Sequence, residues 1–127
     1  EQEYVPVGSR TARKVDVRFI AATNKDVRTE IKEKNLRADI YYRIADFPLE
    51  LPPLRNRGED VILLAEHFLE EFTCGEKKLS RSASQALVTH SWAGNVRELQ
   101  SVIKRAIVYC GGRTIIRAED IAFASIT

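Results

Sequence analysis

The sequence predicts a mixed α/β segment followed by an all-α segment, and three observations support that prediction. Residues 15–20 alternate apolar and charged side chains and are rich in branched and aromatic types, which is typical of a β-strand. Residues 58–72 and 96–110 instead carry apolar side chains at helical spacing. The dipeptide Pro52-Pro53 separates the two patterns, because it removes two backbone donors and favours an extended connector.

The first predicted subdomain covers residues 1–53 and alternates strands with helices. Its strand over 15–20 runs directly into the segment Ala-Ala-Thr-Asn. A charged surface helix with a narrow apolar stripe is expected over 25–35. A second short helix is expected over 38–45, and a short strand over 46–51 leads into the prolines.

The second predicted subdomain, residues 54–127, is a small helical bundle. Its first long helix spans 58–72, opens with acidic side chains and ends shortly before a glycine. Ser80 or Ser82 is expected to cap a further helix that runs through Thr89.

The last long helix is expected to begin at Asn95, which with Glu98 three residues later resembles a capping box. Gly111-Gly112 should end it, and a short helix should follow over 117–121. The apolar stripes of the two long helices are expected to face each other across one core. Their members are Val61, Leu64, Ala65, Phe68, Leu69, Phe72, Val96, Leu99, Ile103, Ala106, Ile107 and Cys110.

Composition limits the classes of function. The 127 residues include 20 Lys+Arg and 18 Asp+Glu, and the formal net charge of +2 is too small to predict a nucleic-acid-binding chain. The length supports one core or two small ones, which excludes a large multidomain enzyme. Cys74 and Cys110 lack zinc-ligand spacing, and we expect a reducing, cytoplasmic location. Because the sequence contains no Met, even at position 1, we expect a piece of a longer protein. Because no apolar run reaches about 18 residues, we expect that the chain does not cross a membrane.

Thr23 and Asn24 stand at the carboxyl end of the first predicted strand, where open α/β sheets place ligand-contacting residues. Their uncharged donors and acceptors suit the orientation of a water or a phosphate oxygen. Alternatively, Asn24 caps the helix that follows.

Arg37 and Arg43 flank a short helical segment. The planar guanidinium fork matches phosphate and can stabilise charge on a transferring phosphoryl group. Their spacing does not place both on one helical face, and Asp39 offers a local partner. A surface salt bridge is therefore the alternative.

Arg97 lies in the first turn of the last long helix, where the macrodipole disfavours a cation. A phosphate held by the helix amino end and by Arg97 would resolve this conflict. Glu98 beside it is the alternative partner.

The sequence lacks the residues that several kinds of catalytic or binding site require. It contains no G-x-x-x-x-G-K-[ST] motif and no apolar strand that ends in Asp-Glu, so the usual phosphate cradle and magnesium ligands are absent from it. His67 is expected to be packed or half-exposed, and no metal site is predicted. No set of nucleophile and base is evident either.

Three long runs together resemble a known family. They are V-D-V-R-F-I-A-A-T-N, then L-R-A-D-I-Y-Y-R-I-A-D-F-P-L-E-L-P-P-L-R-N-R-G-E-D-V, and then S-W-A-G-N-V-R-E-L-Q-S-V-I-K-R-A-I. In this order they resemble the second half of the AAA+ domain of sigma-54-dependent, NtrC-type transcriptional activators, and they cover essentially the whole chain. The fold implied is the carboxyl-terminal portion of an AAA+ α/β subdomain followed by an all-α helical lid.

The resemblance implies a bacterial response regulator or enhancer-binding protein that couples hydrolysis of ATP with Mg to remodelling of sigma-54 RNA polymerase in a hexameric or heptameric ring. Thr23 and Asn24 would be sensor I. Arg37 and Arg43 would be arginine fingers that reach the nucleotide of the neighbouring subunit. Arg97 would be the sensor II arginine, which contacts phosphate from its own subunit.

The same resemblance also marks what this sequence does not contain. The P-loop, the magnesium-binding Asp-Glu and the G-A-F-T-G-A loop that touches sigma-54 would lie upstream, and a DNA-binding helix-turn-helix downstream. Ala93 replaces a Pro that many members have. We therefore expect this chain alone neither to bind ATP tightly nor to hydrolyse it. The alternative function is a non-enzymatic helical module that binds nucleic acid or protein, which the small net charge disfavours for nucleic acid.

Overall fold

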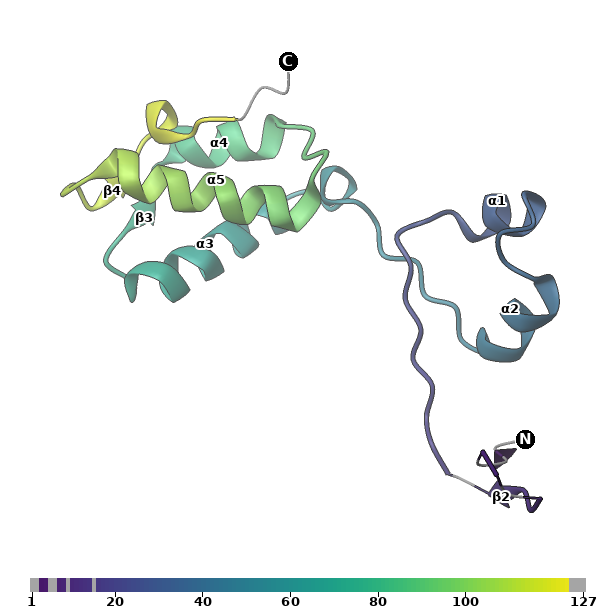
Figure 1. Ribbon diagram of the computed structural model, residues 1–127. Helices are drawn as coiled ribbons and strands as arrows, with labels where there is room; N and C mark the ends of the chain where they lie inside the picture. Colours follow the sequence, from purple (N-terminus) through teal and green to yellow (C-terminus); the bar gives the residue numbers. More distant parts are fainter. Residues whose placement is uncertain (1–2, 5–6, 9, 15, 124–127) are drawn as a thin grey trace. The chain divides into compact units, whose positions relative to one another are not determined.

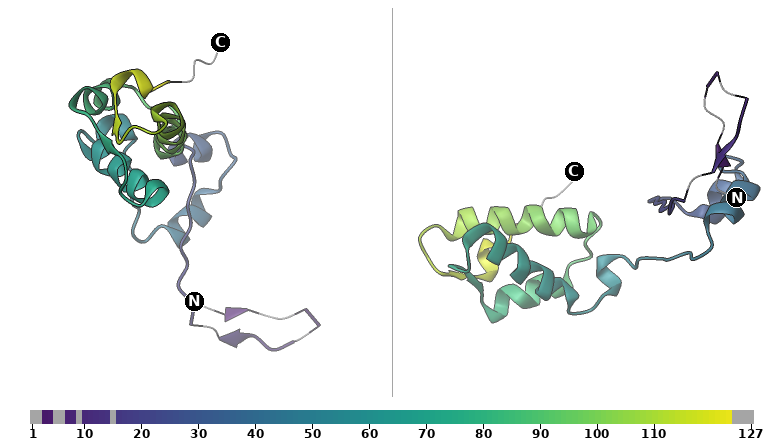
Figure 2. Two further views of the ribbon diagram at one scale, coloured as in Figure 1. Left: turned by 90° about the vertical axis from the view of Figure 1, so that its left-hand side faces the viewer. Right: turned by 90° about the horizontal axis from the view of Figure 1, so that it is seen from below.

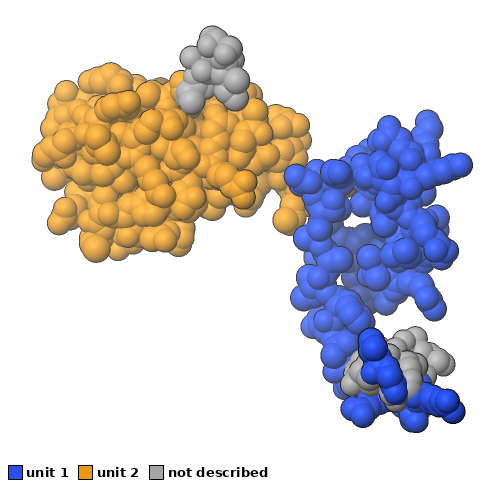
Figure 3. All heavy atoms as spheres, in the orientation of Figure 1, with its two compact units in different colours: residues 1–49 blue, residues 50–127 orange. Residues whose placement is uncertain are grey.

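The computed structural model describes the chain except for residues 1–2, 5–6, 9, 15 and 124–127 (Figure 1). The chain divides into two compact units, residues 1–49 and residues 50–127 (Figure 3).

The first unit contains short elements only. β1 (Glu3–Tyr4) pairs antiparallel with β2 (Arg13–Lys14), and the helices are α1 (Val27–Lys32) and α2 (Ala38–Ile44). The predicted helix over 38–45 is confirmed by α2, whereas α1 is shorter than the predicted 25–35.

The strands predicted over 15–20 and 46–51 do not form in the residues that the structure describes, which corrects the sequence-based expectation; residue 15 lies outside the described residues. Residues 16–20 and 46–51 have no regular secondary structure. The sheets of the described chain are β1–β2 and β3–β4, and neither includes these segments. A strand is stable only when a neighbour pairs with it and a layer covers one face. Instead Phe19 and Phe47 are exposed, at 72% and 91% of their full surface.

The second unit is a helical bundle with a small parallel ladder (Figures 1 and 2). Its elements in chain order are the 3₁₀ turn η1 (Leu54–Asn56), α3 (Asp60–Thr73), β3 (Lys78–Leu79), α4 (Arg81–Thr89), α5 (Asn95–Cys110), β4 (Ile115–Ile116) and the 3₁₀ turn η2 (Ala118–Asp120). The pairing of β3 with β4 joins the α3–α4 connection to the segment after α5.

One core holds the second unit together, as the apolar stripes predict. Every member of the two predicted stripes is buried in this core or packs against it. α4 contributes Ala83 and Leu87, and Trp92 from the α4–α5 turn is 1% exposed. The three helices α3, α4 and α5 pack together in Figures 1 and 2 because each of them buries one apolar face.

Most helix ends follow the predicted chemistry. Ser80 caps α4, since its hydroxyl accepts a hydrogen bond from the Ala83 N–H at 3.1 Å. Gly111, at φ +59°, ends α5. The predicted capping box of Asn95 and Glu98 is wrong in its first half: Gly94 occupies the N-cap position of α5, and the Asn95 side chain bonds elsewhere.

Candidate functional site

Thr23 and Asn24 lie just before α1, and both are exposed. The Thr23 hydroxyl accepts a hydrogen bond from the Lys25 N–H at 3.1 Å. The cap of α1 is Asp26, whose carboxylate accepts from the Arg28 N–H at 3.1 Å. The interpretation of Asn24 as a helix cap is therefore wrong, because Asp26, two residues later, takes that role with the stronger acceptor.

Arg37 and Arg43 lie at opposite ends of α2. Arg37 occupies the N-cap position, and Nε and Nη2 donate to the two Asp39 carboxylate oxygens at 3.1 and 2.9 Å. The predicted local ion pair is confirmed for Arg37. Arg43 is exposed in the last turn, where the helix dipole favours a cation. The six-residue offset corresponds to about 9 Å along the helix axis, so the two arginine side chains leave α2 at well-separated positions.

The start of α5 is held by a long-range bond. Asn95 has a left-handed φ of +51°, which Asn tolerates better than most residues. Its side-chain oxygen accepts a hydrogen bond from the Leu54 N–H at 2.8 Å. The bond joins η1, at the beginning of the bundle, to the first turn of α5. Local sequence reasoning missed it because the two residues are 41 positions apart.

The Glu98 carboxylate is engaged on both oxygens. Oε1 accepts from the Gly94 N–H at 2.8 Å, and Oε2 lies 2.7 Å from His90 Nε2. Burial alone would raise the pKa of Glu98, but the Gly94 N–H and the His90 ring hold it below its ordinary value. Glu98 is therefore not the partner of Arg97, which corrects the alternative drawn from the sequence. The role of His90 was missed, although Glu98 follows it closely in sequence.

Arg97 lies in sequence between Asn95 and Glu98, whose side chains make the contacts described above. Its side chain is exposed, and it makes no hydrogen bond or ion pair to any residue that the structure describes. In the first turn of a helix, the macrodipole disfavours a cation by about 0.3–1 kcal/mol. An anion bound there would gain from the guanidinium and from the helix amino end together.

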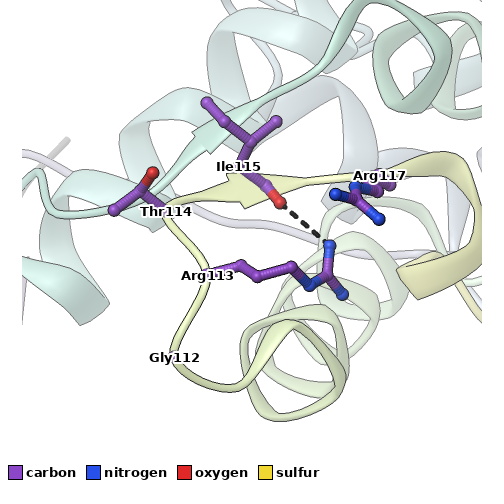
Figure 4. A pocket seen from close by; sticks show the side chains of 5 residues that line it. All are labelled: Gly112, Arg113, Thr114, Ile115 and Arg117. Carbon is purple, nitrogen blue, oxygen red and sulfur yellow. Dashed lines mark hydrogen bonds between the residues drawn. The ribbon is translucent and has the colours of Figure 1, made fainter.

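A second candidate region lies beyond the other end of α5 (Figure 4). An open hollow of about 380 Å³ is lined by Gly112, Arg113, Thr114, Ile115 and Arg117. The Arg113 guanidinium donates to the Asp120 carboxylate at 2.8 Å and to the Ile115 carbonyl at 3.3 Å, the second bond being drawn in Figure 4. Arg113 is paired with Asp120 at 2.8 Å, and Arg117 lies 3.7 Å from Glu119. Because both arginines that line it already have an acidic partner, this hollow is a weaker anion site than the surroundings of Arg97.

Other site types find no support in the described part of the chain. No group of His, Cys, Asp and Glu side chains there is arranged to hold a metal ion. His67 is largely exposed and lies 3.7 Å from Glu71. Among the described residues, no helix is both long and apolar enough to cross a membrane.

Comparisons with known proteins cover both units. Residues 55–125 match the family described as AAA+ ATPase lid domain, and residues 1–50 match the Sigma-54 interaction domain. The Regulatory protein AtoC of Escherichia coli (strain K12) is 43% identical over 125 residues, which are 95% of this chain and 27% of that protein. The Anaerobic nitric oxide reductase transcription regulator NorR of Enterobacter sp. (strain 638) is 48% identical over 127 residues, which are 91% of this chain and 25% of the relative.

Solved structures agree in fold. The crystal structure of NtrX from Brucella abortus in complex with ATP matches with a TM-score of 0.77 and 30% identity, over 95% of this chain and 30% of that one. The NtrX structure in complex with ADP matches with a TM-score of 0.78, also at 30% identity, over 95% of this chain and 29% of that one. The chain thus spans between a quarter and a third of the length of the proteins it matches.

Proposed function

Because the chain belongs to the AAA+ family of sigma-54-dependent transcriptional activators, we propose that it supplies one part of an ATP site that is shared between subunits of such an activator. Residues 1–53 would be the carboxyl-terminal part of the α/β subdomain, and residues 54–127 would be the helical lid. The whole protein would be a cytoplasmic bacterial regulator that uses ATP with Mg to remodel sigma-54 RNA polymerase.

The partners of the whole protein follow from the same premise. Neighbouring AAA+ subunits would form a hexamer or heptamer around the shared sites. Sigma-54 and DNA would be contacted by segments outside this chain. Since the sequence has no P-loop motif, ATP would bind tightly only to a form of the protein that includes one.

The observation that best supports a nucleotide role is the exposed Arg97 on a fixed helix start. The turn around it is bonded to Leu54 and His90, while its guanidinium has no partner in the described chain. Arg81 also lies exposed in the first turn of a helix, so this position alone does not single out Arg97. What distinguishes Arg97 is its place in G-N-V-R-E-L, which matches the sensor II motif of the family.

Thr23, Asn24, Arg37 and Arg43, all in the first unit, would be the further nucleotide-contacting residues of the whole protein. Thr23 and Asn24 would act as sensor I, which orients water near the terminal phosphate. The weakly held Arg37 and the exposed Arg43 would be arginine fingers, which stabilise charge on the nucleotide of the next subunit.

The proposal is tested by Arg97→Ala in a form of the protein that includes the P-loop. Loss of a hydrogen bond to a charged phosphate should weaken ATP affinity by about 10- to 100-fold. Arg81→Ala is the matched control, because it removes an exposed arginine from the first turn of α4. Equilibrium titration with a fluorescent ATP analogue measures both. Equal affinities of Arg97→Ala and the control would refute the phosphate role.

A further inference from the structure

The first turn of α5 is fixed on both sides of Arg97. On one side, the Asn95 side chain accepts from the Leu54 N–H at 2.8 Å. On the other side, Glu98 accepts from the Gly94 N–H at 2.8 Å. The backbone that carries Arg97 is thus tied down at two points, although the Arg97 guanidinium itself is exposed.

The second oxygen of Glu98 bonds to a ring that is itself held in place. His90 Nε2 lies 2.7 Å from Glu98 Oε2. The His90 ring stacks on Phe123 with centroids 3.9 Å apart and planes 7° from parallel. It also forms a T-shaped contact with the Trp92 ring, with centroids 4.5 Å apart, and Trp92 donates from its indole nitrogen to the Leu87 carbonyl. His90 therefore fixes the direction of the Glu98 carboxylate.

The fit between Gly94 and Glu98 is close. A Cβ atom placed on Gly94 would lie 2.7 Å from the Glu98 Cβ, so no larger residue fits without a shift of the turn. The side chains of His90 and Glu98 are only 23% and 22% exposed. A charge-assisted bond that is screened from water in this way is stronger than a surface ion pair. The contacts of Glu98 with Gly94 and His90 therefore hold this turn more firmly than the first turn of an exposed helix is usually held.

We propose that Glu98 is a positioning residue for Arg97 and that His90 orients Glu98 for this purpose. The inference rests on the proposed role of Arg97 as a phosphate ligand and adds the residues through which that role is set. Glu98 touches no phosphate in this scheme. Glu98 fixes the turn in advance, so that binding of an anion to Arg97 does not cost the conformational entropy of ordering the Arg97 backbone.

The first test uses the 127-residue chain. Glu98→Ala should speed hydrogen exchange of the Gly94 amide by about tenfold, because the amide loses its acceptor. Glu98→Gln keeps an acceptor and should stay within about threefold of the parent. Glu66→Ala is the control, since Glu66 is an exposed carboxylate of α3 without a bond to any described residue. Unchanged exchange at Gly94 in Glu98→Ala would overturn the inference.

The second test is a double-mutant cycle on ATP affinity in a form of the protein that includes the P-loop. Glu98→Ala should weaken affinity by about three- to tenfold when Arg97 is present. In the Arg97→Ala background the same change should have no further effect, since a positioning residue acts through its partner. His90→Gln should reproduce part of the loss, and His67→Gln, at the exposed histidine of α3, should not.

The outcomes separate this inference from the proposed function. In one outcome, Arg97→Ala weakens ATP affinity and the double variant shows the full additional loss of Glu98→Ala. Glu98 then acts independently, so the inference is wrong while the proposed function of Arg97 stands. If Arg97→Ala leaves affinity unchanged, the proposed phosphate role is wrong and the inference falls with it. A loss in Glu98→Ala that disappears in the double variant supports both.

Discussion

The proposed nucleotide-contacting arginines differ in how firmly the chain holds them. Arg37 is bidentate on Asp39, with both side chains exposed at 75% and 60%. An exposed pair of this kind contributes only about 0–1 kcal/mol, so Arg37 can exchange Asp39 for a phosphate at little cost. Arg43 has no hydrogen bond or ion pair within the described chain. By contrast, the exposed Arg97 side chain extends from a helix turn that is held by the hydrogen bonds of Asn95 and Glu98.

The arginines of α2 give a prediction at this scale. In the assembled protein, Arg37→Ala or Arg43→Ala should lower ATP hydrolysis by about 10³-fold, because a group that neutralises transition-state charge is lost. Nucleotide affinity should change little, and Arg28→Ala, an exposed arginine of α1, is the control. Mixing either variant with a P-loop variant should recover part of the activity, which a phosphate-release assay measures. No recovery in mixtures that still form rings would contradict action across the interface.

Local chemistry accounts for what the sequence predicts correctly among single residues. The Arg37–Asp39 pair and the Ser80 cap involve neighbours in sequence, and both are confirmed. Because Asn is a common cap, the sequence predicts that role for Asn95, but its side-chain oxygen accepts a hydrogen bond from the Leu54 N–H instead. Only the packing of η1 against α5 brings that donor within reach, and no local pattern reports such packing.

Among the elements, helices were predictable and strands were not. A helix satisfies its hydrogen bonds within its own segment, so the apolar periods of α3 and α5 suffice to predict them. A strand requires a partner that the local pattern does not reveal. The alternation in residues 15–20 indicates a strand, yet residues 16–20 form none in this chain.

α5 gives a prediction on packing. Ile103 is fully buried in the core, and Val108 on the same helix is 74% exposed. Ile103→Ala should lower the free energy of unfolding by about 2–5 kcal/mol, since it leaves a cavity. Val108→Ala, the matched truncation, should change it by about 0.5 kcal/mol or less. Denaturant titration followed by circular dichroism measures both, and equal losses would show that α5 packs through another face.

η2 gives a prediction on pH. The Asp120 side chain is 5% exposed and accepts from the Arg113 guanidinium and from the Arg117 N–H. The Arg113 hydrogen bond, helped by the Arg117 N–H, holds the pKa of Asp120 below its ordinary value. A depressed folded pKa stabilises the fold above the unfolded pKa of about 3.9, and this contribution is lost as pH falls through the lower, folded value.

We therefore expect Asp120→Asn to reduce stability at neutral pH and to weaken the loss of stability that follows as the pH falls below about 5. The control is Glu119→Gln, because the Glu119 side chain is 69% exposed. Urea unfolding at a series of pH values measures the dependence. If Asp120→Asn keeps the full acid dependence of the parent chain, Asp120 is not its source.

At the scale of the whole molecule, the two units differ in how they are stabilised. All buried side chains of the described residues lie between Leu54 and Ile121, in the second unit. The first unit leaves large apolar side chains exposed, among them Phe19, Ile20, Phe47 and Leu49. Such surface normally meets another layer or chain. The chain spans about a quarter of the length of the curated relatives AtoC and NorR.

This contrast predicts that residues 50–127 fold without the first unit. A chain of those residues should unfold cooperatively, with a Tm within about 4 °C of the full 127-residue chain, because it retains the whole core. Calorimetry measures the transition. Limited proteolysis of the full chain should cut first within residues 1–49. A broad, non-cooperative transition of residues 50–127 would show that the first unit is needed for folding.

Trp92 makes the second unit separately visible in solution. It is the one tryptophan of the sequence, it is 1% exposed, and its ring lies against His90 and Phe123. Tryptophan emission from this chain therefore comes from the bundle alone, whatever the first unit does. A neighbouring imidazole can quench that emission, so the fluorescence of the unlabelled protein provides an optical signal for the contact that holds the start of α5.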